Sequence, residues 1–103
     1  MNKNHNWTYE EVEYCTEEIF KSFVVNREYD YEILLDKLFI HFDMKIKKGS
    51  LKMFLQDIKY LFQKHNIPNT LTISPLTNAS STQVLAFNNM LKKYAKIKIT
   101  DRD

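Results

Sequence analysis

Turn-forming residues are scarce in this sequence of 103 residues, which has one glycine and two prolines. A sandwich or barrel of many short strands needs turn residues at regular spacing, so the scarcity argues against such folds and favours long helices with few connections. The single cysteine, Cys15, excludes an internal disulfide. Because its neighbours at helical spacing are apolar, we expect Cys15 to be a small core side chain.

The sequence also lacks a signal-peptide segment and any apolar run close to the length that crosses a membrane. We therefore expect a chain of a reducing cell interior with no membrane partner. Its length fits one domain, residues 1–103, and we expect residues 1–6 and 98–103 to be flexible.

Residues for catalysis are sparse and scattered. The three histidines (His5, His41 and His65) fall in different predicted elements, and none has a metal-ligand spacing with cysteine or acid. One glycine cannot build a phosphate-cradling loop. The acids of the first predicted helix lie on a solvated face. We therefore expect no enzyme activity, no metal and no cofactor.

Two helices are predicted in the first half of the chain. Thr8 and Glu11 form a capping-box pattern, with Trp7 and Val12 as its hydrophobic staple, which predicts a helix over about 9–24. Asp30 can cap a second helix that ends near residue 42. For this second helix, Tyr29 and Leu34 are the predicted staple.

Two more helices are predicted in the second half. Residues 47–62 carry an apolar stripe at three- and four-residue steps, and Ser50 is the predicted N-cap of a helix over about 51–64. Asn66 in the left-handed conformation, followed by Ile67 and a proline, would end it. Ser80 and Gln83 form a second capping-box pattern that opens a fourth helix.

The remaining segments are shorter. The pattern of residues 70–78 predicts an ordered connection or a short edge strand. The pattern of residues 97–103 predicts a terminal strand or a frayed end. The fold class is therefore all-α: a compact bundle of about four helices with a helix-turn-helix-like trihelical core and a possible short C-terminal strand.

Charge is distributed unevenly along the chain. Residues 1–36 hold nine acids and three bases, and residues 37–103 hold twelve bases and four acids. Such asymmetry points towards nucleic acid, unless the two halves lie together and neutralise each other.

The third predicted helix is the candidate for binding nucleic acid. In trihelical helix-turn-helix modules, the N-terminal turn of the third helix meets base edges and flanking groups meet phosphate. Lysine can donate to guanine, and glutamine can bind adenine. The candidate nucleic-acid-binding residues are Lys45, Lys47, Lys48, Ser50, Lys52, Gln56 and Lys59. A solvated face of an ordinary core helix is the alternative explanation of the same pattern.

A family resemblance rests on three segments: residues 7–11 (WTYEE), 49–58 (GSLKMFLQDI) and 73–78 (ISPLTN). They resemble a helical N-terminal domain shared by anti-CRISPR proteins of Gram-positive phages and by some HNH-endonuclease-like proteins. The resemblance covers most of residues 7–92. It implies a helix-turn-helix-like module that binds double-stranded DNA at a promoter and represses its own operon, in the cytoplasm of a bacterial host.

Two positions depart from the family pattern. Phe54 stands where a lysine is expected, and Asp57 where an asparagine is expected. An acid on the DNA face would repel phosphate. Three functions therefore stay open: a repressor of phage or mobile-element origin, an anti-defence protein that inhibits a CRISPR nuclease complex, and an assembly protein. A homodimer is a further possible state, with apolar contact candidates Tyr60, Met90 and Tyr94.

Overall fold

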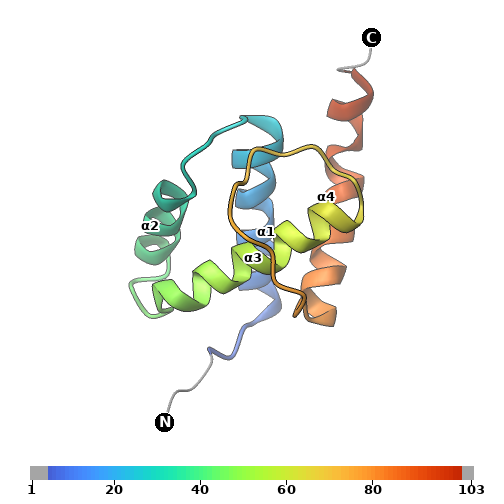
Figure 1. The fold of residues 1–103 in the computed structure, drawn as a ribbon. Helices are drawn as coiled ribbons and strands as arrows, with labels where there is room; N and C mark the ends of the chain where they lie inside the picture. Colours follow the sequence, from blue (N-terminus) through green and yellow to red (C-terminus); the bar gives the residue numbers. More distant parts are fainter. Residues whose placement is uncertain (1–4, 101–103) are drawn as a thin grey trace.

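Four α-helices account for most of residues 5–100, the part of the chain that the computed structural model describes (Figure 1). They are α1 (Tyr9–Phe20), α2 (Tyr31–His41), α3 (Lys48–Lys64) and α4 (Ser81–Thr100), and a π-helical turn, η1 (Lys21–Val25), extends α1. This part of the chain contains no β-strand. The all-α bundle of about four helices is therefore confirmed.

The chain's C-terminal end differs from the expectation. Residues 97–100 belong to α4, so the strand that was one expectation for residues 97–103 does not form over them. Extending an existing helix adds one hydrogen bond per residue, and this outweighs a short Lys–Ile alternation. Residues 1–4 and 101–103, which we expected to be flexible, lie outside the described residues.

Local capping sets the helix starts. The Glu11 N–H donates to the Thr8 hydroxyl at 3.2 Å, and the Thr8 N–H donates to the Glu11 carboxylate at 3.0 Å. Ser80 and Gln83 exchange the same pair of bonds at 2.8 and 3.1 Å. Asp30 accepts from the N–H of the residue two positions later, at the first turn of α2. Both capping boxes and the Asp30 cap are confirmed.

The expected staple before α2 does not form. Leu34 is buried, whereas Tyr29 is 74% exposed. Residues 26–30 are all exposed, because they bridge from η1 to α2 outside the core. The chain therefore approaches α2 along the surface, with the Tyr29 side chain in solvent. The Asp30 side chain caps the start of α2 without a staple.

Two helices end with a left-handed residue that is not glycine. Asn66 has φ 54°, and the Ile67 N–H donates to the carbonyl of Phe62 at 2.9 Å, which confirms the predicted end of α3. The same geometry ends α2, where Asp43 has φ 56°. These bonds satisfy carbonyls that the helix itself leaves unpaired.

The connection from α3 to α4, residues 66–80, is ordered but forms no strand. Leu71 and Ile73 insert into the core, with exposed fractions of 1% and 5%. The Thr70 N–H donates at 2.9 Å to the carbonyl of Phe23, a group of the π-helical turn. Figure 1 shows the connection running across α3 on its way to α4.

The core lies where α1, α3 and α4 meet. The Phe20 ring of α1 is 5.2 Å from both the Phe62 ring of α3 and the Phe87 ring of α4, measured between centroids. Cys15 is fully buried, as expected, and burial raises the pKa of its thiol. None of the helices within residues 5–100 is long and apolar enough to cross a membrane.

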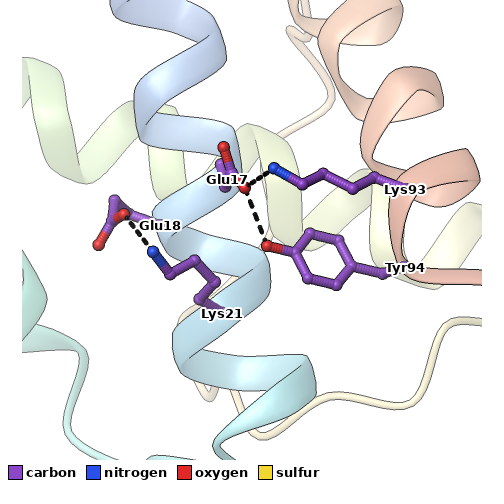
Figure 2. Close-up of polar contacts among 5 residues, drawn as sticks. All are labelled: Glu17, Glu18, Lys21, Lys93 and Tyr94. Atoms are coloured by element: carbon purple, nitrogen blue, oxygen red, sulfur yellow. Dashed lines mark hydrogen bonds and ion pairs between the residues drawn. The ribbon is translucent and has the colours of Figure 1, made fainter. Parts of the chain in front are cut away.

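Polar contacts join α1 to α4 beside this core (Figure 2). The Glu17 carboxylate accepts from the Lys93 ammonium and, at 3.0 Å, from the Tyr94 hydroxyl. The Lys93 bond is the main reason that the pKa of Glu17 lies below its usual range. Burial, together with the Glu17 carboxylate beside it, raises the pKa of the Tyr94 phenol to about 12. One acid from the acidic half is thus neutralised by the basic half.

Replacing Glu17 with glutamine should lower the free energy of unfolding at pH 7 by about 1 kcal/mol, because the charged acceptor is lost. A carboxyl with a lowered folded-state pKa stabilises the fold above its unfolded pKa, about 4.3. The stabilisation is lost as the pH falls through the lower, folded-state value.

Urea denaturation of both proteins at pH 7 and pH 3 measures this difference. Glu28→Gln is the matched control, since the Glu28 side chain is exposed and forms no ion pair with a described residue. An equal effect of the two substitutions at pH 7 would contradict the prediction.

Candidate nucleic-acid interface

The N-terminus of α3 has no side-chain cap. Its N-cap residue is Lys47, and Leu51 already donates to the Lys47 carbonyl at 3.1 Å. Ser50, the predicted N-cap, is therefore the third helical residue. The helix starts earlier than predicted. Ile46 is buried in the core and fixes the chain there, so α3 begins two residues later, at Lys48.

Three backbone N–H groups are consequently available at this helix end. The N–H groups of Lys48, Gly49 and Ser50 precede the first intrahelical bond. Lys48 and Gly49 are exposed, and Ser50 is half-buried. A Cβ atom added to Gly49 would meet no atom within 4 Å, so the space beside this residue is open. Sequence reasoning missed Gly49, although the only glycine of the chain falls at this point.

Exposed lysines surround this helix end. Lys45, Lys47 and Lys52 are exposed, and none forms an ion pair with another residue that the structure describes. Lys48 pairs with Asp36 of α2 at 2.8 Å, and its ammonium lies 5.3 Å from the centre of the Phe39 ring. Both members of that pair are largely exposed, so the bond holds Lys48 only weakly. We call Lys45, Lys47, Lys48 and Lys52 the basic corner.

Two predicted residues lie apart from the basic corner. Gln56 is half-buried, and its carbonyl accepts from the N–H of Leu76 at 3.2 Å. The Lys59 ammonium donates to the side-chain carbonyl of Asn69 at 3.1 Å, and burial lowers the pKa of Lys59. The Gln56 contact is made by its main-chain carbonyl and the Lys59 contact by its side chain, so the connection packs on α3 at both positions.

Asp57 lies away from the basic corner. It is only 9% exposed, and its Oδ1 atom has no hydrogen-bond partner. Burial raises the pKa of Asp57, while the Gln83 side chain and the Asn78 backbone oppose this shift. The carboxylate is thus largely buried near the first turn of α4, on a cavity wall and not on the exposed surface that carries the basic corner.

Phe54 is a core residue. It is 3% exposed, and its ring lies 4.9 Å from the ring of Trp7. At the position where the resemblance leads us to expect an exposed lysine, the Phe54 ring instead packs on Trp7. This contact holds the N-terminal segment against α3. Within residues 5–100, no three His, Cys, Asp or Glu side chains gather in a way that could hold a metal ion.

Comparison with protein-family models, with curated proteins and with solved structures finds no match for this chain.

Replacing Asp57 with asparagine should raise the free energy of unfolding at pH 7 by about 1 kcal/mol, because a buried acceptor without a partner loses its charge. A raised folded-state pKa means that folding opposes ionisation, so stability falls as the pH rises through that value. The gain should therefore shrink below about pH 4, where the carboxyl is protonated in both states.

Urea denaturation of the two proteins at pH 7 and pH 3 tests this expectation. A destabilised asparagine variant at pH 7 would show that the ionised carboxylate supports the fold.

Proposed function

We propose that this chain is a DNA-binding module that contacts DNA through the basic corner. The observation that supports this most strongly is the cluster of exposed lysines around an uncapped helix N-terminus. Phosphate is attracted by the positive side chains and can accept from the free N–H groups at the same place. Among the residues that the structure describes, Asp36 is the only acid that pairs with the corner.

The arrangement of α2 and α3 fits a helix-turn-helix-like unit. Residues 42–47 join the two helices, which pack against each other, and α3 presents its N-terminal turn outwards. In such units this turn contacts base edges. Lys52 is the exposed side chain one turn along, and it can donate to guanine. Because the connection covers α3 at Gln56, base contacts are confined to the first turns, and phosphate supplies most of the affinity.

The biological role that we propose is transcriptional repression, including autorepression of an anti-defence operon in a phage or mobile element. This role rests on the motif resemblance, and DNA binding rests on the basic corner. The two parts can be tested separately, since the first needs the chain's own promoter and the second needs any duplex.

A Lys47→Gln/Lys52→Gln variant should bind a short fluorescent duplex about tenfold more weakly than the wild-type chain at moderate salt. The plot of log affinity against log salt should also become less steep by about 2, because two phosphate contacts are lost. Fluorescence anisotropy at several salt concentrations measures both quantities.

The matched control is Lys64→Gln/Lys92→Gln, which removes the same charge from two exposed lysines. Lys64 lies at the opposite end of α3 and Lys92 lies in α4. If both double variants bound DNA equally more weakly, the loss of affinity would come from net charge and not from the basic corner. Absence of binding by the wild-type chain at low salt would overturn the proposal.

A protein-binding role is the second candidate, and a different surface favours it. Ile33 and Ile40 lie two turns apart on α2 and are 57% and 67% exposed. Tyr29 and Met44, just beyond its two ends, are 74% and 65% exposed. We call these four residues the α2 stripe. Exposed apolar side chains gathered in this way are typical of protein contacts, including the expected contact with a CRISPR nuclease complex.

The residues expected to form a dimer contact lie elsewhere. Met90 is buried, and Tyr60 and Tyr94 are half-buried. The α2 stripe is therefore a better candidate for contact with a second copy as well as with another protein.

If a partner protein covers the α2 stripe, the free chain should be monomeric by light scattering. An Ile33→Gln/Ile40→Gln variant, which removes apolar surface and adds no charge, should then keep its DNA affinity and lose inhibition in a nuclease cleavage assay. A wild-type dimer that this variant dissociates would assign the stripe to a second copy of the chain. Unchanged cleavage with the wild-type protein present would remove the support for inhibition.

A further inference from the structure

A cavity of about 410 Å³ lies between the segment before α1, the outer part of α3 and the start of α4. Its volume falls within the range of small-molecule sites, roughly 300–1,000 Å³. The segment contributes His5 and Trp7, α3 contributes Ser50, Phe54 and Asp57, and α4 contributes Thr82. The lysines of the basic corner do not line the cavity.

Asp57 is the acid of this cavity, and its Oδ1 atom is the only buried side-chain atom of the described residues that lacks a hydrogen-bond partner. Buried polar atoms are nearly always paired, so such an atom needs an explanation. Turning the carboxylate about its Cβ–Cγ bond exchanges the two oxygens, so either one can meet a donor that enters the cavity. The strongest such donor is a cation.

The other polar groups around the cavity are already engaged or neutral. The His5 ring donates from Nε2 to the Glu11 carboxylate at 2.7 Å, and this carboxylate offsets any positive charge on the ring. Ser80 and Gln83 bond to each other in the capping box. The hydroxyls of Ser50 and Thr82 remain as neutral acceptors at the wall. The cavity therefore favours a positive ligand.

Aromatic rings on the cavity wall favour one class of cation. The Trp7 and Phe54 rings lie 4.9 Å apart and inclined at 42°, and both line the cavity beside Asp57. A guanidinium is planar, can stack on aromatic rings and can bind a carboxylate through two N–H groups. It is also more weakly hydrated than an ammonium, so it loses less on entering a half-enclosed site.

We propose that this cavity is a binding site for a guanidinium group, held by Asp57 against the rings of Trp7 and Phe54. The group is carried either by a free guanidine or by an arginine side chain of a peptide or protein. This site uses no lysine of the basic corner, although Ser50, in the first turn of α3, lies on its wall.

Trp7 is the only tryptophan of the chain, so its fluorescence reports on the cavity. The full-length protein is titrated with methylguanidine, with a capped Gly-Arg-Gly peptide, and with the same peptide carrying neutral citrulline in place of arginine. We expect saturable changes with a dissociation constant on the order of 1 mM for at least one guanidinium probe. The citrulline peptide should cause no saturable change.

The control variant is Asp57→Asn, which keeps the shape of the side chain and removes its charge. It should bind each guanidinium probe at least about tenfold more weakly, a difference of about 1.4 kcal/mol. Its cooperative unfolding in urea verifies that it is folded. Binding of the arginine peptide alone would assign the site to a protein partner, and binding of methylguanidine would support a free ligand.

Equal affinity of the wild-type chain and the Asp57→Asn variant would overturn the proposal, as would no saturable change with either guanidinium probe. Neither result bears on DNA binding, which the Lys47→Gln/Lys52→Gln variant tests separately.

Discussion

The packing of α3 is the constraint on which the rest of the structure depends. One side of this helix supplies the central apolar residues of the core, including Leu51, Leu55 and Ile58, which are fully buried. The connection of residues 66–80 covers part of the other side. Ile46 before the helix and the left-handed Asn66 after it fix both ends. The basic corner therefore surrounds the start of this helix, and the same helix supplies one wall of the cavity.

Local signals in the sequence predicted the ends of the elements well, because capping involves residues three or four positions apart. Both capping boxes and the end of α3 are of this kind. The start of α3 was predicted wrongly at Ser50, because burial of Ile46 decides it. The path of the connection was not predictable either: it depends on Thr70 bonding to Phe23, a residue 47 positions earlier.

The candidate site divides in the same way. Lys45, Lys47, Lys48 and Lys52 are close in sequence, so their proximity could be predicted without a structure. Gln56 and Lys59 share their helix face by periodicity, but the connection that engages them could not be foreseen. The enclosed position of Asp57 also depends on tertiary contacts. α3 thereby carries the basic corner at its start and the acid Asp57 about 14 Å further along its axis.

The most direct test of the central claim is a titration of the ¹⁵N-labelled chain with a short DNA duplex, followed by amide chemical shifts. Binding at the basic corner predicts the largest shifts at the N–H groups of Lys48, Gly49 and Ser50, with smaller shifts beyond Gln56. Shifts confined to α4, or none at low salt, would contradict the account.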